Sequence, residues 1–284
     1  MSDDLLDEWT IEPRTETAAF RVREVWRYRR MARFFARRAV ERLYRRTILG
    51  RAWLLIRPLF PLVVKALIFG VLLSVPADGI PYFLFLVVGT ASWELFVSCA
   101  TWATRSLEFN RGLLTRVYVP RLILPVATMA PAFITFGIHL AVIAAAYGWY
   151  AVRGTPAPFG GVGQLRWVVL GTLLAWLMAL GLGLITSVAA ASARDVRFTL
   201  AYVLEFWGFL TPVLYSTSAM PERWRWLFQL NPMTSVVEMF KYGMFGVGTV
   251  EPRGIASTLV TVVVLLSVGI WYFTRAESQA VDRI

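Results

Sequence analysis

The sequence contains one cysteine and one histidine in 284 residues. The lone cysteine, Cys99, cannot form a disulfide within the chain or a cysteine-based metal site. The lone histidine, His139, cannot build a multi-histidine metal site, so we interpret it as a packed or hydrogen-bonded residue of an apolar segment. We therefore predict no metal site in this chain.

A phosphate-binding loop of the form GxxxxGK[ST] is also missing. Such a loop cradles nucleotide phosphates on backbone N–H groups, so the chain has no site of this type for ATP hydrolysis. The glycines Gly160, Gly161 and Gly163 precede an apolar run rather than open a βαβ unit, and we interpret them as a loop. We expect neither a catalytic site nor a cofactor in the chain itself.

Lysine is scarce, since only Lys65 and Lys241 occur, yet Lys and Arg together number 29 against 18 Asp and Glu. The basic residues behind the net charge of +11 lie before and between the apolar runs. Membrane orientation and lipid headgroups account for basic residues at such positions. The sequence therefore predicts a membrane environment and no nucleic-acid partner.

Apolar residues dominate, since 57% of the chain is hydrophobic and the mean hydropathy is +0.59. Several windows of about 20 residues carry almost no charge, and each is long enough to cross a hydrocarbon core about 30 Å thick. Backbone polar groups in lipid must be paired within the chain, which makes these windows helices. We predict an all-α, multi-pass protein of the bacterial inner membrane, with six transmembrane helices over about 53–75, 81–102, 122–150, 167–190, 199–215 and 255–273.

The segment before the first span has two parts. Residues 1–19 are acidic and polar, without the apolar core of a signal peptide, and we expect a solvated tail. In residues 20–46 apolar side chains follow one helical arc and arginines the other, which predicts a helix in the membrane plane on an anionic leaflet. A basic soluble helix that binds an acidic partner or a nucleic acid is the alternative. We therefore predict four segments: a cytoplasmic tail over 1–19, an interfacial helix and linker over 20–52, a transmembrane domain over 53–274 and a second cytoplasmic tail over 275–284.

Arginines orient the helices by the positive-inside rule. They gather in the leader, in the loop at 105–121, in the turn at 192–198 and in the C-terminal tail. This distribution places both termini in the cytoplasm. The segment 216–253 also holds several basic residues and fits this orientation least well.

Residues 216–253 are too polar to cross the membrane, and they favour two short helices that meet at residues 231–232. We predict a re-entrant extracellular hairpin between transmembrane helices 5 and 6, because non-helical backbone at membrane depth is tolerated only inside protein or beside water. The residues that suit the caps of its second helix are Thr234 or Ser235 at the start and Gly243 or Gly246 at the end.

The hairpin supplies candidate residues for an extracellular gate. They are Trp224, Trp226, Asn231, Pro232 and Glu238. An interfacial aromatic belt is the alternative role for the two tryptophans. Glu238 and Lys241 have the i, i+3 spacing of an ion pair on one helix face.

Carboxylates and aromatic rings inside the predicted spans are candidates for a substrate pathway. Intramembrane carboxylates are costly, so Glu94 and Glu205 contact polar cargo or form hydrogen bonds between helices. Aromatic rings stack on the C–H faces of sugars, although packing between helices explains any single one equally well. The pathway candidates are Trp93, Glu94, Tyr202, Glu205, Trp207 and Tyr215.

Three stretches resemble the polysaccharide-exporting branch of the ABC-2 permeases, which move O-antigen, capsule or teichoic acid. They are FNRGLLTRVYVPRLILP (109–125), the stretch RDVRFTLAYVLEF to FKYGMFG (194–246) and RTILGRAWLLIRPLF (46–60). Together with six spans and an amphipathic leader, the resemblance covers nearly the whole chain. It implies a homodimeric permease that pairs with a separate ATP-binding cassette subunit, which binds ATP and Mg and hydrolyses the ATP.

The resemblance also implies roles for particular segments. The segment from Asn110 to Arg121 matches a cytoplasmic coupling segment that docks on the ATPase, and the leader matches an interfacial helix beside a lateral opening for a lipid anchor. The coupling residues are then Asn110, Arg111, Arg116 and Arg121. Arg51 and Arg57 lie where the leader meets the first span, placed to hold a phosphate or pyrophosphate headgroup.

The expected function is export of a lipid-linked polysaccharide through a channel at the dimer interface. Two alternatives stay open at the level of sequence. One is an ABC-2 exporter of drug, haem or lipid, which would have a narrow hydrophobic slit instead of a wide aromatic channel. The other is a membrane-embedded glycolipid enzyme, which would need paired carboxylates or a nucleophile and base near the headgroups.

Overall fold

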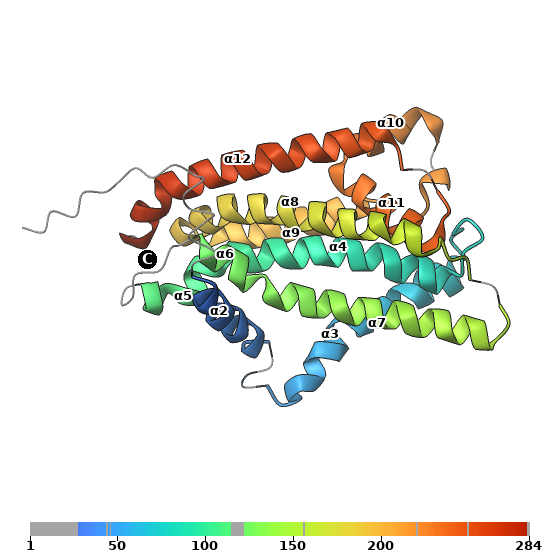
Figure 1. The fold of residues 1–284 in the computed structure, drawn as a ribbon, viewed down its shortest axis with the longest axis horizontal. Coiled ribbons are helices and arrows are strands. Elements are labelled where there is room, and N and C mark those ends of the chain that lie inside the picture. Colours follow the sequence, from blue (N-terminus) through green and yellow to red (C-terminus); the bar gives the residue numbers. More distant parts are fainter. Residues whose placement is uncertain are drawn as a thin grey trace, which may run out of the picture.

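The computed structural model describes residues 28–43, 45, 47–114, 122–155, 157–219, 221–248 and 250–282. Over these ranges the chain is helical and forms no strand, as the all-α prediction requires. Figure 1 shows the long helices lying along one axis. In chain order the α-helices are α2 (Arg29–Glu41), α3 (Trp53–Lys65), α4 (Tyr82–Thr104), α5 (Ser106–Leu114), α6 (Ile123–Thr128), α7 (Ala130–Val152), α8 (Leu165–Ser192), α9 (Asp195–Phe209), α10 (Glu222–Leu230), α11 (Pro232–Phe245) and α12 (Pro252–Asp282).

Five helical stretches are long and apolar enough to cross a membrane. They are Gly50–Leu72, Tyr82–Thr104, Ile123–Val152, Val162–Ser192 and Pro252–Arg275. These match five of the six predicted spans. At the predicted span 199–215 the structure has α9, whose 15 residues extend about 22 Å at 1.5 Å per residue. This helix ends at Phe209, and the chain continues to residue 215 through turns.

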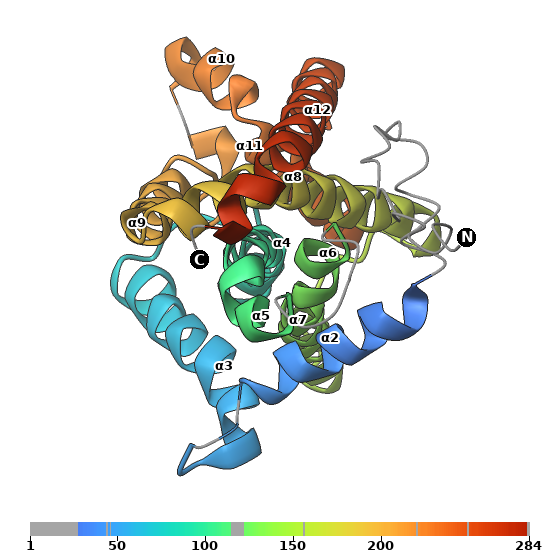
Figure 2. The ribbon, with the colours of Figure 1, turned by 90° about the vertical axis from the view of Figure 1, so that its left-hand side faces the viewer.

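Helix α4 forms the centre of the bundle. Figure 2 looks along the long axis and shows the other helices arranged around it. Its buried residues include Phe85, Phe96 and Cys99, because a helix that is apolar on all sides needs neighbours on all sides. Helices α8 and α12 also approach closely, since a Cβ on Gly181 would lie 2.6 Å from the carbonyl carbon of Leu265. Small residues allow such backbone contact in membrane helices.

Helix α3 departs from this regular packing. Pro58 and Pro61 lie inside it and each removes a backbone donor from the helix. The chain then continues through a π-helix over Ala66–Leu72. Figure 2 shows α3 set away from the helices around α4, and large apolar side chains such as Phe60 are exposed on it. The irregular helix leaves room for a cavity between α3 and α4.

Helix α2 is the described part of the predicted leader helix; residues 1–27, 44 and 46 lie outside the described ranges. Phe35 and Ala39 are buried, and Phe35 belongs to a second hydrophobic cluster with residues of α5, α6, α8 and α12. The apolar side of α2 therefore contacts the bundle. Arg37, on the other side, is exposed and pairs with Glu41 at 3.1 Å.

Helices α10 and α11 form the predicted pair of short helices around Asn231. The prediction that Thr234 or Ser235 caps α11 is wrong. The cap is Asn231, whose side-chain oxygen accepts a hydrogen bond from the backbone N–H of Met233, and Pro232 follows at the position where a missing N–H costs nothing. The other end is Gly246, which has a φ of 70° and ends the helix in the left-handed conformation, as predicted.

Candidate transport pathway and coupling surface

A cavity of about 460 Å³ lies between α3 and α4. Arg57 and Lys65 of α3 and Glu94 of α4 contribute its charged groups. Hydroxyl groups complete the polar wall, and they belong to Thr47, Thr90, Ser98, Thr101 and Thr135. The cavity thus combines two cations, one carboxylate and several hydroxyl groups between otherwise apolar helices. A guanidinium and an ammonium group together suit a phosphate or pyrophosphate.

Some of the predicted headgroup and pathway residues line this cavity and others do not. Arg57 and Glu94 line it, whereas Arg51 lies exposed on the short turn Gly50–Ala52 and is not among its lining residues. Lys65 lines the cavity, although sequence reasoning gave it no headgroup role. Lys65 lies about two helical turns beyond Arg57 on α3, so the two side chains are expected on the same face of the helix. This spacing could have indicated that both residues serve one site.

Trp93 and Trp207, two of the pathway candidates, meet inside the bundle. Their ring centroids lie 6.2 Å apart at an interplanar angle of 74°, and Phe96 lies 5.4 Å from Trp207. Trp93 is only 7% exposed. The indole Nε1 of Trp207 donates a hydrogen bond of 2.9 Å to Oδ1 of Asn231. This aromatic cluster therefore joins α4 and α9 to the start of α11.

The remaining pathway candidates belong to α9 and to the turn after it. Tyr202 is 64% exposed, and Glu205 and Phe206 are exposed beside it on the outer side of the helix. Tyr215 lies in the turn, where its hydroxyl donates to the carbonyl of Phe209 at 2.8 Å. The structure thus separates these residues from the contact between Trp93 and Trp207.

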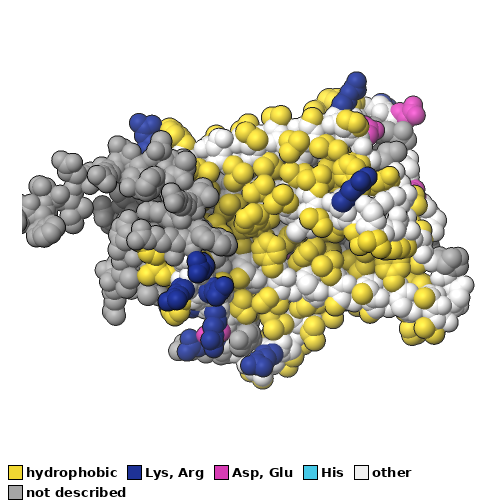
Figure 3. All heavy atoms as spheres, in the orientation of Figure 1, with side chains coloured by type: hydrophobic (Ala, Val, Ile, Leu, Met, Phe, Trp, Pro, Cys, Tyr) yellow, Lys and Arg dark blue, Asp and Glu magenta, His cyan; other side chains and the backbone are white. Residues whose placement is uncertain are grey.

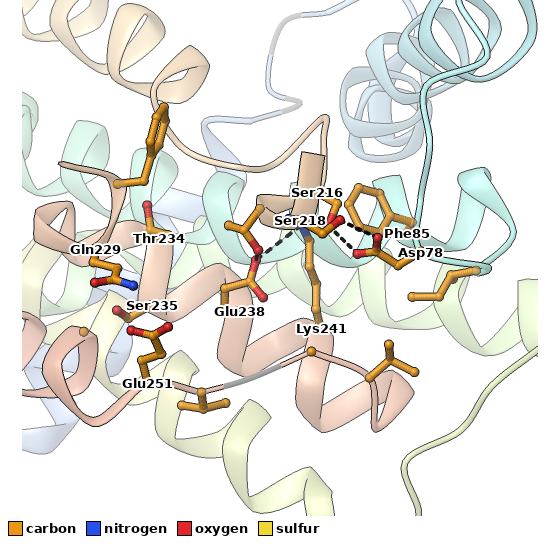
Figure 4. Close-up of a pocket in the computed structure, with 17 residues that line it drawn as sticks. Asp78, Phe85, Ser216, Ser218, Gln229, Thr234, Ser235, Glu238, Lys241 and Glu251 are labelled. Carbon is orange, nitrogen blue, oxygen red and sulfur yellow. Dashed lines mark hydrogen bonds and ion pairs between the residues drawn. The ribbon is translucent and has the colours of Figure 1, made fainter. Parts of the chain in front are cut away.

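A second cavity, of about 280 Å³, lies at the end of the bundle that carries α10 and α11. Figure 4 shows Asp78, Glu238 and Lys241 lining this outer cavity, with Glu238 and Lys241 on α11 and Asp78 on the loop before α4. Asp78 accepts hydrogen bonds from the hydroxyls of Ser216 and Ser218. These contacts attach the loop before α4 to the turn that follows α9.

Lys241 occupies the centre of these contacts. Its Nζ donates to the carbonyl of Pro212 at 2.6 Å, lies 3.8 Å from Oε1 of Glu238 and sits 3.9 Å from the centre of the Phe85 ring. The predicted i, i+3 pair is thereby confirmed. Glu238 also accepts a hydrogen bond of 3.3 Å from the hydroxyl of Thr217.

Burial dominates the electrostatics of this ion pair. It lowers the pKa of Lys241 to about 8, while attraction to Glu238 and Asp78 opposes the shift. Burial likewise raises the pKa of Glu238, and Lys241 opposes that shift. A buried pair of this kind is costly to break, because removing one partner leaves an unpaired charge.

The other predicted gate residues lie on the outer side of α10 and at its junction with α11. Trp224 and Trp226 are exposed. Asn231 donates to the hydroxyl of Thr211 at 3.0 Å as well as accepting from Trp207, and Pro232 opens α11. The gate candidates therefore fall into an exposed pair and a hydrogen-bonded junction.

The first residues of the predicted coupling segment lie on α5, at the opposite end of the bundle. Asn110 is buried and its side-chain amide donates to the carbonyl of Ser106 at 2.9 Å. The backbone of Arg111 belongs to the same helix. Arg116 and Arg121 lie outside the described residues.

Helix α5 is attached to α2 through one aromatic side chain. The ring of Phe109 has the guanidinium carbons of Arg42 and Arg105 at 4.5 and 4.6 Å from its centre. Arg42 also donates to the backbone carbonyl of Phe109. Cation–π contacts of this kind stabilise by about 0.5–1 kcal/mol each at exposed sites.

Helix α5 is attached to α9 by an ion pair. Glu108 accepts a hydrogen bond from the guanidinium of Arg197 near the start of α9. Sequence reasoning did not identify the contacts that Glu108, Phe109, Arg42 and Arg197 form around α5. Phe109 opens one of the stretches that carry the family resemblance and Arg197 lies in another, but nothing in the sequence paired either residue with its distant partner.

The chain is similar to known membrane transport proteins. The ABC-2 type transporter family matches residues 32–245. The O-antigen export system permease protein RfbA of Myxococcus xanthus is 27% identical over 229 residues, which cover 78% of this chain and 82% of that protein. The protein of the same name from Klebsiella pneumoniae is 24% identical over 234 residues, which cover 82% and 87%.

A third relative matches over a shorter stretch. The inner membrane transport permease YadH of Escherichia coli (strain K12) is 29% identical over 89 residues, which cover 31% of this chain and 35% of that protein. The family match, in contrast, extends over most of the chain, from α2 to the end of α11. The resemblance seen in the sequence is thereby confirmed: this chain belongs to the ABC-2 type transporter family and is the membrane subunit of a transporter.

Proposed function

We propose that this chain is the permease subunit of an ATP-driven exporter that moves a lipid-linked polysaccharide of the O-antigen type across the inner membrane. Two of its relatives are named O-antigen export permeases. The observation that carries the proposal is the cavity between α3 and α4, with Arg57 and Lys65 in its wall.

This cavity suits the headgroup of a lipid-linked glycan. The anchor of such a molecule joins a hydrocarbon chain to phosphate, and a charge in the hydrocarbon region costs several kcal/mol unless it finds a partner. Arg57 and Lys65 supply that partner, while exposed apolar residues such as Phe60 on α3 and Leu67 on the π-helix after it keep the hydrocarbon chain in contact with lipid. Arg51 lies before this site and meets the headgroup first.

The proposed topology has six crossings. The sixth consists of α9 together with residues 210–215, which complete the path that α9 is too short to cover alone. Figure 1 shows α2 and the end of α12 at one end of the bundle, which fits an even number of crossings. By the positive-inside rule this end is cytoplasmic, α2 lies at the interface, and the α10–α11 hairpin is the extracellular gate.

The proposed passage lies between two copies of the chain. Figure 2 shows α3 and α9 on the same side of α4, and both expose large side chains there, including Phe60 and Tyr202. A homodimer formed around these helices encloses a passage lined by Tyr202 and Glu205. The aromatic cluster of Trp93 and Trp207 supports its wall from behind.

The energy comes from a separate ATP-binding cassette subunit, which holds ATP and Mg. It docks on the segment 110–121 and moves α5. The contacts of Phe109 with Arg42 transmit this movement to α2, and the ion pair of Glu108 with Arg197 transmits it to α9. A movement of α5 thereby changes both the position of α2, beside the opening for the lipid anchor, and the position of α9, beside the passage.

The proposed function is tested by deleting the gene for this chain in its native cell. Loss of surface polysaccharide, with lipid-linked polysaccharide accumulating inside the inner membrane, is the expected result, and the intact gene restores export. Unchanged surface polysaccharide, together with greater sensitivity to drugs or altered lipid or haem export, would contradict the proposal and favour another class of ABC-2 exporter.

A further inference from the structure

A groove on the outside of the bundle runs between α7 and α8 and ends at α2. It consists of two adjoining cavities, of about 400 Å³ beside α2 and about 430 Å³ farther along. Phe133 and Trp176 line both, which makes the groove continuous. Apart from Arg33 and Thr172, all its lining residues are apolar.

The length of the groove matches one leaflet of a membrane. Its wall follows α7 from Ala130 to Leu140, a distance of about 15 Å at 1.5 Å per residue. Half of a hydrocarbon core about 30 Å thick has the same length. One acyl chain that extends from the headgroup region to the bilayer centre therefore fits along it.

The groove has a charged end. Arg33 of α2 is exposed and lines the cavity there, and no carboxylate of the described residues pairs with it. Two other arginines of this region have partners within the protein, since Arg37 pairs with Glu41 and Arg42 donates to a backbone carbonyl. Figure 3 shows hydrophobic side chains across the middle of the molecule and a group of Lys and Arg side chains near the end that carries α2.

We propose that this groove binds one anionic phospholipid. Its acyl chain lies between α7 and α8, and its phosphate accepts charge-assisted hydrogen bonds from Arg33. A phospholipid whose headgroup carries an additional ammonium group is attracted less, because that group repels the same guanidinium. The bound lipid fastens α2 to the transmembrane bundle.

This site is separate from the cavity between α3 and α4. No residue of α3 lines either part of the groove, and the proposal does not depend on which molecule the transporter exports. The occupant is a membrane phospholipid rather than cargo.

Native mass spectrometry of the purified transporter in a non-ionic detergent tests the assignment. Phosphatidylglycerol and phosphatidylethanolamine with identical acyl chains serve as probes, and the wild-type protein should retain the first in preference to the second. Arg33→Ala should reduce retention of phosphatidylglycerol about tenfold, the value of one charge-assisted hydrogen bond. Arg33→Lys should keep most of it. Arg30→Ala, which removes an exposed arginine of the same helix that lines neither cavity, is the matched control and should change nothing.

A second pair of variants tests the apolar part of the groove. Ala130→Phe narrows it beside Phe133 and Trp176, and Thr172→Trp fills its farther part; each should lower retention of phosphatidylglycerol while the thermal unfolding midpoint shows that the protein is folded. Equal retention of the two phospholipids, or retention that survives either Arg33→Ala or both filling variants, would overturn the proposal. So would a polyprenyl phosphate found in the groove in place of the phospholipid, because the groove would then belong to the cargo.

Discussion

The indole N–H of Trp207 donates a hydrogen bond of 2.9 Å to the side-chain oxygen of Asn231. The same oxygen accepts from the backbone N–H of Met233 at 3.1 Å, and the side-chain nitrogen donates to the hydroxyl of Thr211 at 3.0 Å. One asparagine thus caps α11 and joins it to α9. In the proposed exporter this contact links the helix beside the passage to the extracellular gate.

Trp207→Phe should loosen that link. The ring stays in contact with Trp93 and Phe96, but Asn231 loses a partly buried donor, and the lost hydrogen bond should cost about 1 kcal/mol of stability. The thermal unfolding midpoint in detergent measures the change. Trp226→Phe is the control, since Trp226 is exposed, and an equal loss of stability in both variants would contradict the assigned role.

The ion pair between Glu108 and Arg197 should couple ATP hydrolysis to transport. Glu108→Gln and Arg197→Gln each remove the link between α5 and α9, so we expect less polysaccharide exported for each ATP hydrolysed. The exchanged double variant, Glu108→Arg with Arg197→Glu, should recover part of the coupling. Arg194→Gln, at an exposed neighbouring arginine, should have no effect. Export per ATP that stays normal in the single variants would remove α9 from the coupling path.

Phe109→Leu should weaken the attachment of α5 to α2. The substitution keeps an apolar side chain but removes the ring that the guanidinium of Arg42 contacts at the end of α2, at a cost of about 0.5–1 kcal/mol for that cation–π contact. Limited proteolysis of α2 in the purified complex measures the loss, with faster cleavage expected. Phe109→Tyr should retain the contact and the wild-type cleavage rate. Cleavage of Phe109→Leu at the wild-type rate would show that the ring of Phe109 does not hold α2 in place.

The ion pair of Glu238 and Lys241 should give the protein a specific pH dependence. Burial lowers the pKa of Lys241 to about 8 from an ordinary 10.5. The unfolded chain therefore holds more protons than the folded protein between these pH values, and this lysine makes stability rise with pH across that window. The double variant Lys241→Met with Glu238→Gln removes both titrating groups. The unfolding midpoint of the wild type should rise relative to that of the variant from pH 8 to pH 10, and a relative fall would refute the assignment.

Local features of the sequence predicted much of the fold. Long runs without charge identified five spans because length and hydropathy are local properties, and the spacing of Glu238 and Lys241 identified their ion pair for the same reason. The end of helix α9 was harder to predict, because the apolar sequence continues past Phe209 although the helix stops there and the chain goes on through turns. The cap of α11 was misassigned because Thr234 and Ser235 are also good capping residues, and only the position of Pro232 favours Asn231.

Contacts between distant segments escaped prediction. Glu108 and Arg197 are 89 positions apart, and Trp93 meets Trp207 across two helices, so their pairing depends on how α4, α5 and α9 pack. The cavity between α3 and α4 likewise depends on how far α3 departs from the bundle. The sequence indicated Arg57 by its charge and its position where the leader meets the first span, and Glu94 as a carboxylate inside a span; the structure places both on one cavity.

The role of the α3–α4 cavity is tested by measuring export in a variant with Arg57→Gln and Lys65→Met. We expect lipid-linked polysaccharide to remain inside the inner membrane and export to fall about tenfold or more, the value of the charge-assisted hydrogen bonds lost from the headgroup. The ATP-binding subunit should still co-purify, and Arg153→Gln, at the far end of α7, should export normally. Normal export by the double variant would contradict the claim that the α3–α4 cavity receives the anionic headgroup of the cargo.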